Sequence, residues 1–152
     1  MATHRYETQV HWTGSTGLGW EHYERTHSAT APGVAQEVAI TTGESKGDPS
    51  ILNPELLLLM AASSCQMLWF LDVASRARVD VVEYRDEAIA LMPLDQEPVR
   101  VSEIELRPHI VVAGEVSEER VHKLVDTAHR HCFISNSLNS NLTINPTVEV
   151  VT

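Results

Sequence analysis

Two cysteines are the residues of this 152-residue chain best suited to covalent chemistry. Cys65 lies in a long apolar segment, and Cys132 directly follows His129-Arg130-His131. A thiolate is a nucleophile, and its oxidation to a sulfenic acid is reversible when a second thiol condenses with it to a disulfide. The pair predicts either thiol redox chemistry or inert burial. The residues alone favour burial, because free cysteine is among the most commonly buried residue types.

The segment around Cys65 predicts a long buried helix. Asn53 can cap this helix with its side-chain oxygen, Pro54 suits the first helical position, and Glu55 complements the positive end of the helix dipole. Almost every residue from 56 to 74 is apolar, and a helix that is apolar on all sides is normally buried.

The composition limits the partners and the location. With 21 acidic and 11 basic residues the formal net charge is -10, which disfavours binding to nucleic acid or to an anionic membrane. Polar residues interrupt the apolar segment, so it falls short of the roughly 20 apolar residues of a membrane span. These residues are Ser63, Ser64, Cys65, Gln66 and Asp72. The first residues lack the apolar core of a signal peptide, so we expect a cytoplasmic protein.

The residues before the long helix predict three strands. The strands are expected at 6–12, 20–27 and 34–41, joined as an antiparallel meander. A polar connection from 43 to 50 then leads into the helix, which we expect to end near Arg78.

The residues after the long helix predict strands around a second helix. We expect a strand at 81–91 and a hairpin of 101–107 with 109–112, bulged or at an edge near Pro108. Ser117 is expected to cap the second helix, which ends at 129–131. A short turn or helix at 132–138 and a closing strand at 142–151 complete the order β-β-β-α-β-β-α-β. This order indicates an α+β fold in a single domain, residues 1–152.

The long helix presents a packing problem that a second chain would solve. A three-stranded meander can cover only one side of a helix that is apolar all round. Four small residues in a row, Ala61-Ala62-Ser63-Ser64, would allow two such helices to approach closely. We therefore expect a homodimer with the two long helices side by side.

The chain resembles the OsmC/Ohr family of osmotically inducible and organic-hydroperoxide-resistance proteins, with features of a less characterised branch. The resemblance rests on Asn53-Pro54-Glu55, on Ala61-Ala62-Ser63-Ser64-Cys65 ten positions later, and on Cys132-Phe133-Ile134-Ser135-Asn136-Ser137 followed by a strand. It implies an intertwined α+β homodimer that reduces organic hydroperoxides. It also implies a dithiol reductant, such as dihydrolipoyl groups, and no prosthetic cofactor.

The resemblance also implies roles for individual residues. Cys65 corresponds to the peroxidatic thiol, Cys132 to the resolving thiol, and Glu55 to the carboxylate that organises the site. Apolar neighbours raise the pKa of a cysteine, so Cys65 needs a cation or hydrogen-bond donors to become a thiolate. The family supplies an arginine for this purpose. Arg25 is the first candidate here, with His22, His27 and Lys46 as alternatives.

Glu55 and Cys65 are too far apart to meet within one straight helix. Ten residues at about 1.5 Å per residue separate them by roughly 15 Å. If two helices cross antiparallel near Met60, Glu55 of one chain would lie level with Cys65 of the other. The alternative is that Glu55 only interacts with the helix dipole.

Two further interpretations concern a metal site and an apolar pocket near the cysteines. His129, His131 and Cys132 lack the spacing of zinc ligands, so we expect no metal site. Trp69 and Phe133, close in sequence to the cysteines, are core residues or line an apolar pocket for an alkyl hydroperoxide. The alternative to a peroxidase is a non-catalytic protein of the same fold that binds a small apolar ligand at the dimer interface.

Overall fold

The fold is that of a computed structural model, which describes residues 2–43 and 46–152. The chain forms two compact units, Met1–Leu57 and Leu58–Thr152, and each is described by itself. The architecture is α+β, as the order of elements predicted, with helices α1 and α2 and strands arranged in three-stranded sheets. The single domain spanning residues 1–152 stays a prediction.

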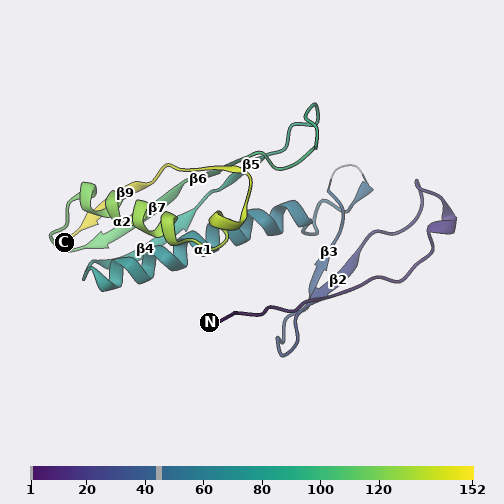
Figure 1. The fold of residues 1–152 in the computed structure, drawn as a ribbon, viewed down its shortest axis with the longest axis horizontal. Helices are drawn as coiled ribbons and strands as arrows, with labels where there is room; N and C mark the ends of the chain where they lie inside the picture. Colours follow the sequence, from purple (N-terminus) through teal and green to yellow (C-terminus); the bar gives the residue numbers. More distant parts are fainter. Residues whose placement is uncertain (1, 44–45) are drawn as a thin grey trace. The chain divides into compact units, whose positions relative to one another are not determined.

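The first unit contains the predicted antiparallel meander. Its strands are β1 (Gln9–His11), β2 (His27–Thr30) and β3 (Val38–Ile40), in the order β1-β2-β3 (Figure 1). A short 3-10 helix, η1 (Thr16–Leu18), lies between β1 and β2.

The predicted second strand, 20–27, is wrong, because β2 begins only at His27. Instead of extending, the chain turns at 20–22 and bends at Tyr23, before Glu24. The Glu24 carboxylate accepts hydrogen bonds from the main-chain N–H groups of Arg25 and Thr26, each at 2.8 Å. These N–H groups are therefore not available to a neighbouring strand.

Helix α1 (Pro54–Arg76) begins where the sequence predicts. The Asn53 side-chain oxygen accepts a hydrogen bond from the N–H of Leu56 at 2.8 Å, which confirms the cap. The turn at Gly43 passes against this end of the helix, since a Cβ there would lie 3.2 Å from the Asn53 amide. The helix is continuous through Cys65 to Arg76.

Only one stripe of α1 is buried, so the expectation of burial on all sides is wrong for a single chain. The buried residues share one face and are Ala62, Gln66, Phe70 and Ala74. Met60 and Leu68 remain 49% and 60% exposed. By length and hydropathy α1 meets the criteria for a membrane-spanning helix, but core helices of soluble proteins meet the same criteria.

The second unit holds two mixed sheets. β4 (Asp80–Asp86), β7 (Pro108–Ala113) and β9 (Thr147–Val151) form one, and β5 (Ile89–Leu91), β6 (Glu103–Leu106) and β8 (Asn141–Ile144) form the other. In each sheet the first pairing is antiparallel and the second is parallel.

The predicted hairpin of 101–107 with 109–112 is wrong. β6 and β7 do not pair with each other; β6 pairs with β5 and β7 pairs with β4. The predicted strand 81–91 is likewise divided into β4 and β5, and the closing strand into β8 and β9. Only Arg107 separates β6 from β7, so Pro108 marks a step between two sheets rather than a reversal of the chain.

Helix α2 (Glu118–His131) begins at the predicted cap. The Ser117 hydroxyl accepts a hydrogen bond from the N–H of Arg120 at 3.3 Å. Val121, Val125 and Ala128 form its buried face and pack with Phe70 of α1 against β7. After α2 the predicted short turn is a 3-10 helix, η3 (Ser135–Ser137).

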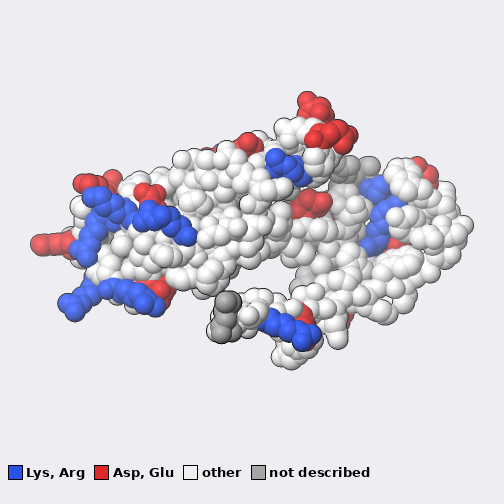
Figure 2. Space-filling view, in the orientation of Figure 1, with Lys and Arg blue, Asp and Glu red and all other residues white. Residues whose placement is uncertain are grey.

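Charged side chains are unevenly distributed over the second unit. On the face in view they gather at the end where α1 stops and α2 starts, and acidic side chains gather at the tip of the loop joining β5 to β6 (Figure 2). Arg120 donates a hydrogen bond to the carbonyl of Ala77 at 2.7 Å, which joins the two helix ends. The middle of this face carries few charges.

Candidate active site

The second unit brings the two cysteines together. Cys65 lies in the middle of α1, and Cys132 is the C-terminal cap residue of α2. Both are free thiols; Cys65 is half-buried and Cys132 is fully buried. The two helices pack on the same sheet, and Cys65 lies close enough to Cys132 to raise the pKa of the Cys132 thiol.

The surroundings of Cys132 keep its proton on the sulfur. Burial raises the pKa of the Cys132 thiol, and the neighbouring Cys65 sulfur raises it further by accepting the S–H and by its charge. Hydrogen bonds from Ser135 act in the opposite direction. The Cys132 thiol is therefore difficult to ionise.

Ser135 contacts Cys132 through its main chain. Its N–H donates to the Cys132 sulfur at 3.5 Å. The Ser135 hydroxyl lies 3.3 Å from Nδ1 of His129. Ser135 therefore contacts both the last turn of α2 and the buried sulfur.

Aromatic rings flank the cysteines. Trp69 lies one helical turn after Cys65, with its ring stacked on His131 at 5.5 Å between centroids and edge-on to Phe133 at 5.2 Å. His131 and Phe133 are the two neighbours of Cys132 in the chain. Phe133 is 64% exposed, so this cluster extends from the thiols to the surface.

Two buried polar atoms near the cysteines have no hydrogen-bond partner within the described residues. They are the Tyr84 hydroxyl and the Gln66 side-chain oxygen. The Tyr84 ring packs against Phe70 at 5.7 Å. Burial raises the pKa of Tyr84 well above its usual value, and the charges of Asp86 and Cys132 add to this effect. The other end of Gln66 donates to the carbonyl of Val125 at 3.2 Å.

Glu55 and Arg25 belong to the first unit. Glu55 is exposed in the first turn of α1, and because α1 is unbroken, Glu55 does not reach the cysteine of its own chain through a helix break. Whether Glu55 meets Cys65 of a second chain stays a prediction.

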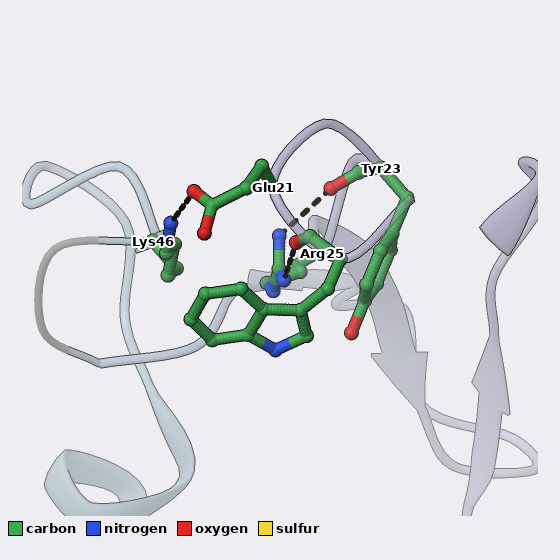
Figure 3. Close-up of polar contacts among 5 residues, drawn as sticks. Glu21, Tyr23, Arg25 and Lys46 are labelled. Carbon is green, nitrogen blue, oxygen red and sulfur yellow. Dashed lines mark hydrogen bonds and ion pairs between the residues drawn. The ribbon is translucent and has the colours of Figure 1, made fainter. Parts of the chain in front are cut away.

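Arg25 is held by its own loop, before β2 rather than in the second strand. Its guanidinium donates to the carbonyls of Tyr23 at 2.9 Å and Trp20 at 2.6 Å, and lies 3.9 Å from the centre of the Tyr23 ring (Figure 3). Lys46 lies over the Trp20 ring at 4.3 Å and forms an ion pair with Glu21. Arg25 and Lys46 are therefore both engaged within the first unit.

The sequence interpretation missed Ser135 and Tyr84 as neighbours of Cys132. It considered His129 as a residue suited to a helix end and, with His131 and Cys132, as part of a set that lacks the spacing of zinc ligands. The spacing of Ser135, three residues after Cys132 at the end of a helix, is typical of a turn that folds back on the cysteine. Tyr84 gives no such signal, because packing of β4 against α1 brings it to the site.

Histidine, cysteine and acidic residues do not gather into a possible metal site: across 2–43 and 46–152, no three of them lie close enough to hold an ion.

Comparisons with known proteins agree on one family. The family described as OsmC-like protein matches residues 47–147, more than half of the chain. A search of curated proteins finds no match.

Solved structures share the fold at low sequence identity. An OsmC-like protein of unknown function from Vibrio cholerae has 23% identity and a TM-score of 0.84, covering 98% of this chain and 100% of its own. An organic hydroperoxide resistance protein OsmC from Legionella pneumophila has 16% identity and a TM-score of 0.69, covering 99% and 100%. The organic hydroperoxide resistance protein OhrB of Bacillus subtilis has 15% identity and a TM-score of 0.59, covering 95% and 98%.

Proposed function

The chain belongs to the OsmC family, and from this premise we propose that it is a thiol-dependent peroxidase that reduces organic hydroperoxides. The observation that carries the proposal is the pair of free cysteines, one half-buried and one buried, within reach of each other. Solved neighbours that are named organic hydroperoxide resistance proteins agree with this choice of substrate.

The reaction begins at Cys65. Its thiolate attacks one oxygen of the hydroperoxide, the O–O bond breaks, and the other oxygen leaves as the alcohol after taking a proton. Cys65 is oxidised to a sulfenic acid. Cys65 suits this step because it is the more accessible thiol and because Cys132 can donate its S–H to the Cys65 sulfur.

Cys132 completes the cycle. Its sulfur attacks the sulfenic acid, the S–S bond forms, the S–O bond breaks, and water leaves. An external dithiol, such as a dihydrolipoyl group, then reduces the disulfide by thiol exchange. The aromatic cluster of Trp69, His131 and Phe133 would hold the apolar part of the hydroperoxide. We expect this cycle in the cytoplasm, where dithiol reductants keep thiols reduced.

The test is peroxide consumption by the wild type and by Cys65→Ser. With cumene hydroperoxide and dithiothreitol we expect the wild type to consume peroxide and Cys65→Ser to fall to the background rate, because serine cannot supply a thiolate. Cys132→Ser should still consume one equivalent of peroxide without forming the disulfide. Intact mass after one equivalent should show a loss of two hydrogens in the wild type. Equal rates for the wild type and Cys65→Ser would contradict the proposal.

The local engagement of Arg25 supports a second candidate function. The Arg25 guanidinium is bound by two carbonyls and an aromatic ring of its own loop. A non-catalytic protein that binds a small apolar ligand at a dimer interface needs no free arginine beside the thiol, so this arrangement agrees with that function. If Arg25 does activate Cys65, Arg25→Ala should lower kcat/KM for cumene hydroperoxide by about tenfold or more. The control is Arg5→Ala, because Arg5 lies on an exposed surface of the same unit. Equal effects of the two substitutions would exclude Arg25 from the reaction.

We further propose that the protein is a homodimer. The exposed apolar face of α1, with Met60 and Leu68, requires a cover, and a second copy of α1 has a matching surface, on which Ser64 is the exposed member of the small residues 61–64. Antiparallel crossing near Met60 would also bring Glu55 of one protomer level with Cys65 of its partner.

A further inference from the structure

A cavity of about 450 Å³ lies at the end of α1. It is formed within the second unit, where the helix turns into β4. Apolar and polar residues both line it, and they are Leu71, Ser75, Arg78, Val79, Asp80 and Val81. Sites that hold small molecules have volumes of about 300–1,000 Å³, so this cavity is large enough for one. The proposed peroxidase reaction uses none of its residues.

The turn at this end of α1 has an arginine where glycine is usual. The Arg78 N–H donates to the carbonyl of Ser75, and the Val79 N–H donates to the carbonyl of Ala74, each at 3.0 Å. These two hydrogen bonds define a Schellman motif, in which the residue at the position of Arg78 takes a left-handed conformation. The φ angle of Arg78 is 57°, which only glycine adopts without a steric penalty. The backbone is therefore strained at Arg78.

Strain of this kind is common at ligand sites. Residues other than glycine persist in the left-handed region only where the surrounding structure holds them, and they cluster at active sites and ligand clamps. The hydrogen bonds of the Schellman motif are made by the main chain, so glycine would form them equally well. Glycine would lack only the guanidinium that Arg78 places at the cavity wall.

The Arg78 side chain has no partner in the part of the chain that the structure describes. Across 2–43 and 46–152 it forms no ion pair and donates no hydrogen bond, and the residue is exposed. By contrast, Arg76 in the last turn of the same helix forms an ion pair with Asp72 at 2.9 Å. Arg78 is thus a cation at a cavity wall whose charge is not yet matched.

The end of α1 does not exclude an anion from this position. The last carbonyls of a helix carry partial negative charge and would repel one. Here the carbonyls of Ala74 and Ser75 accept main-chain hydrogen bonds. The carbonyl of Ala77 accepts a hydrogen bond from the Arg120 guanidinium at 2.7 Å. The charge of Arg120 therefore balances the helix end and leaves Arg78 for a ligand.

The apolar part of the cavity is continuous with the core of the second unit. Val79 is only 7% exposed and belongs to the same cluster as Phe70. Leu71 and Val81 are partly buried and pack against that cluster. A hydrocarbon chain placed on this wall would leave water for an apolar surface, which is favourable.

Asp80 is the acidic residue of the cavity wall. Its carboxylate repels an anion and attracts a cation, so it opposes the effect of Arg78. Asp80 is an ordinary strand residue at the start of β4, paired with Ala113, whereas the strained backbone belongs to Arg78. The geometry therefore favours an anion, and the charge at residue 80 provides a check of the sign.

We propose that this cavity binds a small amphiphilic carboxylate. The Arg78 guanidinium binds the carboxylate through two parallel hydrogen bonds, the geometry that arginine and carboxylate groups prefer. The hydrocarbon chain lies against Leu71, Val79 and Val81. This site is separate from the thiols, because Cys65 lies roughly 15 Å from Ser75 along the helix at about 1.5 Å per residue. The proposal does not depend on the peroxidase activity.

The first test is calorimetric titration of the full chain with octanoate, below the concentration at which octanoate forms micelles. We expect binding by the wild type and a Kd about tenfold or more higher in Arg78→Asn, because the charged hydrogen bonds are lost. Asparagine tolerates the left-handed conformation, so this variant should fold. Arg76→Gln is the matched control, since it removes the same charge from the same helix end, and its Kd should stay within about twofold. No binding by the wild type, or equal losses in the two variants, would overturn the proposal.

The second test checks the sign of the ligand charge and the apolar wall. Asp80→Asn should lower the Kd for octanoate, and octylamine should bind the wild type more weakly than octanoate. Butanoate should also bind more weakly, because each methylene removed from water tightens binding by up to about fourfold. Tighter binding of octylamine, or equal affinities for butanoate and octanoate, would overturn the proposal.

The third test separates ligand binding from folding. Glycine takes the φ angle of Arg78 without strain, so the Tm of Arg78→Gly should not fall. Octanoate should raise the Tm of the wild type, because a ligand that binds only the folded state stabilises it, and should leave the Tm of Arg78→Gly unchanged. An equal rise in both proteins would overturn the proposal.

Discussion

Cys65 and Cys132 have the same side chain in different surroundings. Cys65 lies on a half-exposed part of α1 beside Trp69, whereas Cys132 is enclosed at the end of α2 and held by Ser135. The two thiols therefore suit different reactions. The accessible Cys65 can react with a hydroperoxide, whereas the enclosed Cys132 can react only with Cys65. This division agrees with the proposed peroxidatic and resolving roles.

The raised pKa of Tyr84 predicts how stability changes at alkaline pH. Because its pKa is raised in the folded state, folding favours the neutral phenol. The associated stability is present below the usual tyrosine value of about 10 and is lost as the pH rises above it. Tyr84→Phe should therefore lose less stability than the wild type between about pH 10 and 11. Urea unfolding at these pH values measures the difference.

The same substitution should be tolerated at neutral pH. The Tyr84 hydroxyl is buried without a partner among the residues that the structure describes, so its removal should change the free energy of unfolding by less than about 1 kcal/mol. Tyr6→Phe is the control, because Tyr6 is 84% exposed and should leave the alkaline slope as it is. A Tyr84→Phe slope equal to that of the wild type would contradict the raised pKa.

Helix α2 packs on the sheet through its buried face and supplies residues of the site from its C-terminal end. Its buried face, Val121, Val125 and Ala128, fixes the helix on the sheet, and its C-terminal end supplies both His129 and Cys132. Helix α1 contributes Cys65 and Trp69 from successive turns of the same face. The site therefore depends on how two helices lie on one sheet rather than on a single loop.

The cap of α2 should measurably support the second unit. Ser117→Ala removes the hydroxyl that accepts from the N–H of Arg120, and we expect the free energy of unfolding to fall by about 1 kcal/mol. Ser75→Ala, on the exposed side of α1, should change it by less than about 0.5 kcal/mol. Urea unfolding of both variants provides the comparison, and equal losses would mean that the cap contributes nothing specific.

At the scale of the whole molecule, the apolar side of α1 is a surface that the single chain leaves exposed. Met60 and Leu68 are about half exposed or more in the single chain, and the middle of the face shown in Figure 2 carries few charges. A homodimer would cover α1, and the charge of -10 would keep the assembled protein soluble.

Leu68→Glu tests the proposed dimer. A carboxylate placed between two apolar helices would be costly to bury, so we expect the dissociation constant to rise by about 100-fold or more and the variant to elute as a monomer. Leu94→Glu is the control, because Leu94 lies 67% exposed on the loop between β5 and β6. Light scattering after gel filtration over a range of concentrations gives the masses. A dimeric Leu68→Glu variant would place the interface elsewhere.

The sequence by itself determined the α+β class, the start of α1 at Asn53 and Pro54, the cap of α2 at Ser117 and the family, because capping residues and apolar periodicity act locally. The tertiary structure decided which strands pair, since β6 pairs with β8 and β7 with β9 across the length of α2, and Pro108 only marks the step between two sheets. It also decided what surrounds Cys132, because Cys65, Tyr84 and Ser135 reach that sulfur from three separate segments. Packing of α1, α2 and β4 makes Cys65 and Tyr84 neighbours of Cys132, and no spacing in the sequence carries that information, whereas Ser135 follows Cys132 by three residues.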